Sequence, residues 1–172
     1  MELLRRVDFP TVFEIMKEAF PESEIRTAAR QEALLENPHY KIYVHRDEAG
    51  EIDCFLAIWE LSNCFFGEHL ASKPSTRGKG VGSGLLKVVL NGLDKPFFLE
   101  VEPPCDEITK RRVGMYERMG LFLNKFYYEQ QPLREGHTPQ RLMVMSYRSP
   151  VGETEFIPYK REIYRHVYDT EL

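Results

Sequence analysis

The sequence contains few cysteines and no long hydrophobic segment. Its 172 residues include only three cysteines, Cys54, Cys64 and Cys105, and their spacing does not match a metal site. We expect three buried, unpaired thiols, as in a reducing compartment. No apolar run approaches the roughly 20 residues of a membrane span, and the N-terminal segment MELLRRVDF is too short and too charged for a signal peptide. These absences predict a cytoplasmic protein that does not associate with membranes.

The sequence also lacks an excess of positive charge. The net charge is −4, which gives no support for nucleic-acid binding. The hydrophobic fraction of 42% and the charged fraction of 29% are typical of a soluble globular protein. Because no repeat, low-complexity tract or long linker divides the chain, we expect one domain over residues 1–172, with 150–172 as a C-terminal extension.

The order of predicted elements indicates a mixed α/β fold. Hydrophobic periodicity and capping signals predict helices over 12–20, 24–36, 82–93, 106–119 and 153–168. Alternating apolar residues predict a strand over 40–46, and we also expect strands over 3–7, 52–61, 64–72, 96–101, 122–128 and 141–147. We therefore expect a mixed, mostly antiparallel central sheet flanked by helices, with the last helix as an addition.

A basic, glycine-rich turn lies between the strand that ends near Ser72 and the helix that begins near Gly82. Glycine occupies positions 78, 80, 82 and 84, so a ligand can approach the backbone closely. The first N–H groups of the helix lack intrahelical acceptors, and Arg77 and Lys79 add positive charge, which predicts a phosphate or pyrophosphate site. The spacing matches neither a P-loop nor the dinucleotide pattern. A surplus of glycine in an exposed turn is the alternative.

The pattern Arg77-x-x-Gly80-x-Gly82 resembles the pyrophosphate loop of the GNAT superfamily of acyl-CoA-dependent N-acetyltransferases, and the order of elements is similar too. The resemblance implies acetyl-CoA as co-substrate and requires no metal. At the position of Thr109, many family members carry an Asn that contacts the pantetheine arm. At the position of Arg112, many carry a small residue. The implied cofactor contacts are Leu70, Ala71, Ser72, Arg77, Gly78, Lys79, Gly80, Val81, Gly82, Ser83 and Thr109.

A second segment, from Tyr116 to Phe122, resembles the family's Tyr-Glu-x-x-Gly-Phe motif, with Leu121 at a position that is often aromatic. In the family this tyrosine can protonate the departing thiolate. A phenol with a pKa of about 10 stays protonated at neutral pH and can donate to a thiolate whose thiol has a pKa near 8.5. Tyr116 is therefore a candidate general acid; the alternative is a purely structural residue of the core.

Carboxylates near the strand ends are candidates for receiving the proton of an ammonium group. The resemblance makes Glu68 the first candidate base and His69 the second, and a regular strand would send the two side chains to opposite faces. Glu100 and Glu102 share one face of the next strand and could hold a cationic acceptor. Tyr127 and Tyr128 could line the acceptor site, although aromatic packing is the more frequent use of such residues. Solvated strand ends would explain the carboxylates equally well.

The sequence therefore predicts an N-acetyltransferase in which a primary amine attacks acetyl-CoA directly within a ternary complex. The segments Glu68–Ala71, Leu99–Pro104 and Phe126–Pro132 also resemble a bacterial branch of predicted acetyltransferases, which implies no particular acceptor. The acceptor is a small-molecule or peptide amine, and a homodimer is compatible with the sequence. Two alternatives remain: a non-catalytic acyl-CoA-binding or regulatory protein, and a partner-binding module on the same fold.

Overall fold

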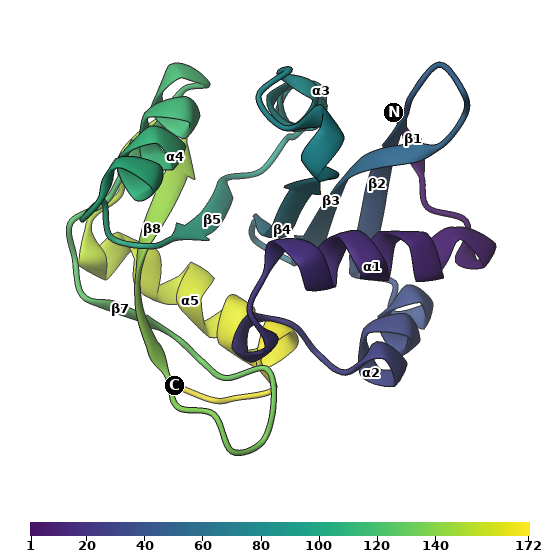
Figure 1. The fold of residues 1–172 in the computed structure, drawn as a ribbon. Helices are drawn as coiled ribbons and strands as arrows, with labels where there is room; N and C mark the ends of the chain where they lie inside the picture. The colour runs from purple at the N-terminus through teal and green to yellow at the C-terminus, as the bar shows by residue number, and fades with distance from the viewer.

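The structure, a computed structural model, describes residues 1–172 and is built around one mixed sheet (Figure 1). Neighbouring strands follow the order β1-β2-β3-β4-β5-β8-β6, and β7 also pairs with β8. Only β4 and β5 pair in parallel. The expected mixed, mostly antiparallel sheet is confirmed. Its strands are β1 (Glu2–Leu3), β2 (Tyr40–Arg46), β3 (Ile52–Glu60), β4 (Phe65–Ser72), β5 (Phe97–Val101), β6 (Leu121–Leu123), β7 (Tyr128–Gln130) and β8 (Gln140–Tyr147).

Helices cover both faces of this sheet. The helices are α1 (Phe9–Ala19), α2 (Ala28–Ala33), α3 (Val81–Asn91), α4 (Glu107–Arg118) and α5 (Glu153–Val167). Apolar residues of α1 and α5 pack in one buried cluster with Phe66 and Phe98, whereas those of α3 and α4 pack in another with Phe97 and Leu99. Because consecutive strand residues fall in different clusters, these helix pairs lie on opposite faces. The predicted C-terminal helix is present (Figure 1).

Three predicted elements differ from the structure. The strand expected over 3–7 is limited to β1 (Glu2–Leu3), and a 3₁₀ turn covers Arg6–Asp8. The helix expected over 24–36 is reduced to α2 between short 3₁₀ turns, and Thr27 caps it by accepting from the Arg30 N–H. Ile25 is extended and buried, and Arg26 beside it is buried too, so the tertiary structure holds this segment out of a helix. The strand expected over 122–128 splits into β6 and β7, because the buried Asn124 binds the Val144 carbonyl and Ser146 with its side-chain amide.

The sheet opens where β4 and β5 separate. Their parallel pairing covers only three residue pairs and ends at Gly67 and Leu99, although β4 continues to Ser72. On the other edge of β4, Ile58 faces Gly67 but Ala57 faces His69, so Glu68 is an extra residue in a β-bulge. Beyond this point the β4 edge that faces β5 has no strand partner.

The three cysteines differ in their exposure. Cys54 and Cys64 are buried and unpaired as predicted, but the prediction is wrong for Cys105, which is exposed just before the cap of α4. No helix is long and apolar enough to cross a bilayer.

Candidate functional site

The glycine-rich turn presents free backbone donors at the start of α3. Gly78 and Gly80 have φ values of +79° and +81°, which residues with a Cβ rarely adopt. Gly80 is the N-cap of α3 and provides no side-chain acceptor, so the first N–H groups of the helix stay unpaired within it. Arg77 and Lys79 are exposed beside these donors. The turn therefore offers backbone N–H groups and two cations to an anion.

The end of β4 lies directly against this turn. A Cβ at Gly82 would be 3.4 Å from Ser72 Oγ and 3.9 Å from Leu70 Cδ1, so the glycine permits close contact between α3 and β4. Arg77 Nε donates to the Ser72 carbonyl at 3.2 Å and ties the turn to the strand. Ala71 alternates to the opposite face, where it is buried with the residues of α1. The structure thus brings the predicted cofactor residues of β4 and α3 together, apart from the side chain of Ala71.

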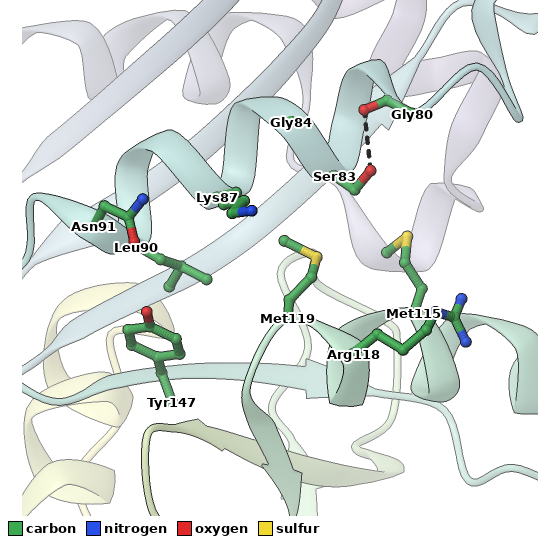
Figure 2. A pocket seen from close by; sticks show the side chains of 10 residues that line it. All are labelled: Gly80, Ser83, Gly84, Lys87, Leu90, Asn91, Met115, Arg118, Met119 and Tyr147. Atoms are coloured by element: carbon green, nitrogen blue, oxygen red, sulfur yellow. Dashed lines mark hydrogen bonds between the residues drawn. The ribbon is translucent and has the colours of Figure 1, made fainter.

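A groove of about 450 Å³ continues from this turn between α3 and α4. Figure 2 shows Lys87 of α3 and Arg118 of α4 on its walls, near Met115 and Met119. Lys87, Met115, Arg118 and Met119 were not predicted to belong to a site, because only the packing of α4 beside α3 makes them neighbours. The complete lining is Gly80, Ser83, Gly84, Lys87, Leu90, Asn91, Met115, Arg118, Met119 and Tyr147.

The structure gives Thr109 a capping role. Asp106 Oδ1 accepts from the Thr109 N–H at 2.8 Å, and Thr109 Oγ1 accepts from the Asp106 N–H at 3.1 Å. The same hydroxyl lies 3.0 Å from Asp106 Oδ1, and the residue is buried. Because the hydroxyl is engaged at the N-terminus of α4, we do not include Thr109 among the proposed cofactor contacts.

Tyr116 lies on α4 with its ring buried in the α3/α4 cluster. Its hydroxyl makes no hydrogen bond within the chain. The oxygen is not completely enclosed, since it is absent from the group of fully buried polar atoms without a partner. Burial raises the pKa of this phenol, and Arg112 acts in the opposite direction. The side chain is therefore a protonated donor without an internal acceptor.

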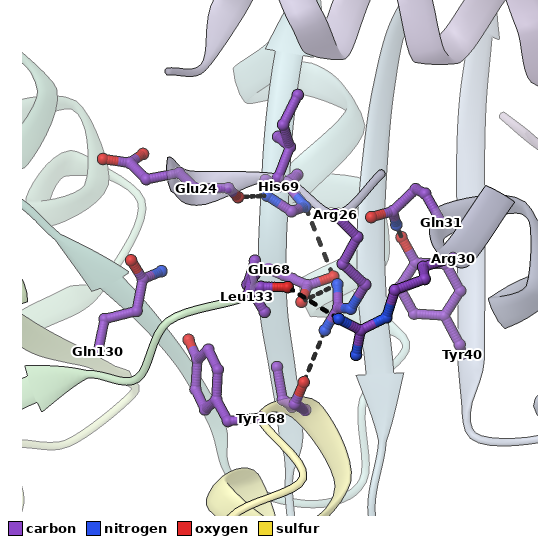
Figure 3. A network of polar contacts seen from close by, with 12 residues as sticks. Glu24, Arg26, Arg30, Gln31, Tyr40, Glu68, His69, Gln130, Leu133 and Tyr168 are labelled. Atoms are coloured by element: carbon purple, nitrogen blue, oxygen red, sulfur yellow. Dashed lines mark hydrogen bonds and ion pairs between the residues drawn. The ribbon is translucent and has the colours of Figure 1, made fainter. Parts of the chain in front are cut away.

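On the opposite face, Glu68 and His69 form a buried polar group with Arg26 (Figure 3). Arg26 Nη1 donates to Glu68 Oε1 at 2.8 Å, and the two side chains are 5% and 2% exposed. Arg26 Nη2 also donates to the Val167 carbonyl at 2.6 Å, so the end of α5 closes over the pair. His69 Nε2 lies 2.7 Å from the Glu24 carbonyl, and His69 Nδ1 lies 3.5 Å from Glu68 Oε2.

This arrangement corrects the expectation for Glu68 and His69. The bulge interrupts the alternation of β4, so the two side chains lie on the same face and approach each other. That face is the one opposite to α3 and the glycine turn. Burial by itself raises the pKa of Glu68, but Arg26 and His69 outweigh it and hold the pKa at about 2. A carboxylate so strongly paired and so fully enclosed is poorly suited to take a proton.

Glu100 has a different environment at the same opening in the sheet. Its carboxylate accepts hydrogen bonds from the Tyr128 hydroxyl, from the Tyr168 hydroxyl at 2.7 and 2.9 Å and from Gln130 Nε2 at 3.0 Å. No arginine or lysine pairs with it. The pKa of Glu100 is raised to about 7, because burial and the nearby negative charge of Glu68 raise it more than the three hydrogen bonds lower it. Glu68 and Glu100 are thus neighbouring carboxyls with pKa values shifted in opposite directions.

Two other predicted acceptor residues lie apart from this group. Glu102 lies beyond the end of β5, is half exposed and pairs with Arg112 Nη1 at 2.6 Å. Tyr127 is 61% exposed, stacks on the Arg141 guanidinium and donates to Glu129. Tyr128, in contrast, is fully buried against Glu100.

Arg26 and Tyr168 were not among the site residues predicted from the sequence. Arg26 lies in the segment expected to be a helix over 24–36, and Tyr168 ends the helix expected over 153–168 as an addition to the fold. Both reach the opening from segments far from β4 and β5 in the sequence. The only local signal was the apolar face of α5, which predicts that this helix packs on the sheet.

The comparisons with known proteins agree with this architecture. No family model matches the chain. A solved structure from Bacteroides thetaiotaomicron, described as "Putative acetyltransferase from GNAT family", superimposes with a TM-score of 0.89 over 99% of this chain and 98% of that one, at 24% identity. The chain therefore has the same fold as this GNAT-family structure. The shared fold includes the C-terminal extension, because the match covers nearly the whole length.

Other proteins described as acetyltransferases are similar over shorter or more distant alignments. "Putative acetyltransferase YjbC" of Bacillus subtilis (strain 168) is 35% identical over 108 residues, which are 62% of this chain and 54% of that protein. The match thus spans about half the length of this curated relative. A variant of spermidine N-acetyltransferase SpeG from Vibrio cholerae has a TM-score of 0.66, at 15% identity over 85% of this chain and 92% of its own. Ribosomal-protein-S18-alanine N-acetyltransferase of Escherichia coli has a TM-score of 0.62, at 19% identity over 88% and 95%.

Proposed function

We propose that the chain transfers the acetyl group of acetyl-CoA to a primary amine, by direct attack in a ternary complex. The observation that carries the proposal is the opening between β4 and β5. The glycine-rich turn, which is suited to an anion, lies on one face of the sheet at this opening, and the carboxyls of Glu68 and Glu100 lie on the other. One opening can therefore admit an anionic thioester donor from one face and a cationic acceptor from the other.

The residues present fit acetyl-CoA. The N–H groups at the start of α3, with Arg77 and Lys79, suit the pyrophosphate. The edge of β4 that faces β5 lacks a strand partner beyond Gly67 and can bond to the amide groups of a pantetheine arm. Lys87 and Arg118 add positive charge along the groove that continues from the turn. Acetyl-CoA supplies the reactive thioester, and Tyr116 is the proposed proton donor to its sulfur.

The acceptor class is proposed from charge. An amine with a pKa near 10 arrives as an ammonium, which buried carboxyls attract and which must lose a proton before attack. The similar enzymes from Vibrio cholerae and Escherichia coli are named for spermidine and for an alanine of a ribosomal protein, both of which carry amines. Whether a small molecule or a peptide is the acceptor is left to the experiment.

The test combines binding and turnover. Calorimetry should detect acetyl-CoA binding to the unaltered protein, and Arg77→Ala with Gly80→Asp should weaken it at least tenfold, since a cation is lost and an anion is added. Gly136→Asp is the matched control, because Gly136 has a φ of +82° and open space around it, so it imposes similar backbone strain elsewhere. Release of CoA thiol should then be measured with aliphatic, aromatic and peptide amines.

Each outcome has a distinct meaning. Wild-type affinity in a folded double variant would overturn the cofactor site. Tight binding of acetyl-CoA with no turnover on any amine would reject catalysis and favour a non-catalytic acyl-CoA-binding protein. Absence of any acetyl-CoA affinity would favour a partner-binding module.

A further inference from the structure

Glu100 is a partly buried carboxyl at the opening that has no cationic partner. Its hydrogen-bond donors come from β7, through Tyr128 and Gln130, and from the residue that follows α5, Tyr168. Figure 3 shows Tyr168 and Gln130 beside the group formed by Glu68 and Arg26. Arg26 pairs with Glu68 through Nη1 and donates to the Val167 carbonyl through Nη2, and it forms no ion pair with Glu100.

The hydrogen-bond partners of Glu100 allow its carboxyl group to exist in two protonation states. A tyrosine hydroxyl both donates and accepts, so Tyr128 and Tyr168 can donate to a carboxylate and can accept from a carboxylic acid after their hydroxyls rotate. An arginine has no acceptor and would favour the carboxylate alone. Glu68 has such an arginine and Glu100 does not. The side chain of Glu100 can thus gain and lose a proton without leaving a buried polar group unpaired.

We infer that Glu100 takes the proton of the acceptor ammonium, and that Tyr128 and Tyr168 are positioning residues that hold its carboxyl at the opening between β4 and β5. The inference rests on the proposed function and replaces Glu68 as the expected base. It also gives the C-terminal extension a role, because Tyr168 belongs to it.

The proton balance of the step is closed. Glu100 accepts one proton from the ammonium and passes it to water. The neutral amine forms the N–C bond to the thioester carbonyl as the C–S bond breaks. Tyr116 gives a proton to sulfur and regains one from the acylated nitrogen through water. The products are an N-acetyl amine, CoA thiol and one proton in solution, and no redox partner is needed.

The electrostatics support this assignment. The groups that face Glu100 are Glu68 from β4, Tyr128 from β7, and Tyr164 and Tyr168 from the α5 end. Burial and the negative Glu68 favour the neutral acid, and the hydroxyl donors favour the carboxylate, which leaves the pKa of Glu100 at about 7. A base with this pKa is half ionised at neutral pH and accepts a proton readily from a desolvated ammonium.

Direct titration tests the inference without knowledge of the acceptor. In protein labelled with ¹³C at the glutamate carboxyls, the signal that Glu100→Gln removes should titrate with a midpoint near pH 7. Tyr168→Phe should raise this midpoint, because one donor to the carboxylate is lost. Tyr127→Phe is the matched control, since its hydroxyl lies outside the group, and it should leave the midpoint unchanged. A midpoint below about 5 in the unaltered protein would overturn the inference.

Kinetics with the best amine of the panel provide the second test. For the unaltered protein, kcat/KM should rise with pH, with a midpoint near pH 7. Tyr168→Phe should move this rise to higher pH. Glu100→Gln should abolish the pH dependence and lower kcat about 10²–10⁴-fold. Acetyl-CoA affinity should stay unchanged in these variants. Full turnover in Glu100→Gln would overturn the inference and leave the proposed function intact. Failure of the unaltered protein to bind acetyl-CoA would instead overturn the proposed function, and the inference with it.

Discussion

Arg26 Nη1 lies 2.8 Å from Glu68 Oε1, and both side chains are almost completely enclosed. The pair links the segment before α2 to the bulge of β4, 42 positions later in the sequence. It neutralises one of the two carboxyls at the opening of the sheet and leaves the other, Glu100, to neutral donors. This difference separates a structural carboxylate from one that can change its protonation state.

The Arg26–Glu68 pair should be strongly coupled. Glu68→Leu or Arg26→Met alone should destabilise the protein by about 3–5 kcal/mol, because each leaves an unpaired buried charge. The double variant should lose much less than the sum of the two, as measured by urea unfolding. The half-exposed pair Arg112 and Glu102 is the control, and its removal should cost at most about 1 kcal/mol. Additive effects at Arg26 and Glu68 would show that the buried pair is not coupled.

Tyr116→Phe should separate catalysis from packing. The ring stays in the α3/α4 cluster, and the lost hydroxyl has no partner within the chain, so thermal stability should hardly change. Turnover should fall about 10²–10⁴-fold with unchanged acetyl-CoA affinity, as expected for loss of a general acid. Unchanged turnover, with the chemical step shown to limit the rate, would return Tyr116 to a purely structural role.

The raised pKa of Glu100 predicts a specific pH dependence of stability. The folded-state pKa of about 7 lies above the ordinary value of 4.5, so the contribution of this group is complete below about pH 4.5 and is lost as the pH rises through 7. Between pH 5 and pH 8 the melting temperature of the unaltered protein should therefore fall relative to that of Glu100→Gln. Parallel curves for the two proteins over this range would contradict the shift.

Gly67 should be required where β4 and β5 separate. A Cβ at this residue would lie 2.7 Å from Cζ of Phe97, whose ring is 1% exposed and has little space to move. Gly67→Ala should destabilise the protein by about 1–3 kcal/mol through overpacking. Gly84→Ala, on α3 with open space around it, should be neutral or slightly stabilising. The unfolding free energies of the two variants check the contrast, and equal effects would refute it.

Much of the fold follows from local patterns. The alternation in 40–46 predicts β2, because one face of that strand meets a buried cluster. The strand expected over 52–61 is β3 within one residue, and both of its faces are buried. The glycine turn and the apolar face of the following helix likewise predict α3 and its open N-terminus. The helix predicted over 24–36 is only partly present, since burial of Ile25 and Arg26 overrides the helical propensity of this segment.

The proposed anion-binding turn follows from the sequence itself, because the free N–H groups, the glycines and the two cations all lie within a few consecutive residues. Only the tertiary structure decided which carboxyl can take up a proton. A bulge at Glu68 depends on the pairing between β3 and β4, and it brings His69 to the same face. Arg26 and Tyr168 then approach Glu68 and Glu100 from 42 and 68 positions away. The pKa of a buried carboxyl depends on such neighbours, and their identity is set by packing rather than by spacing along the chain.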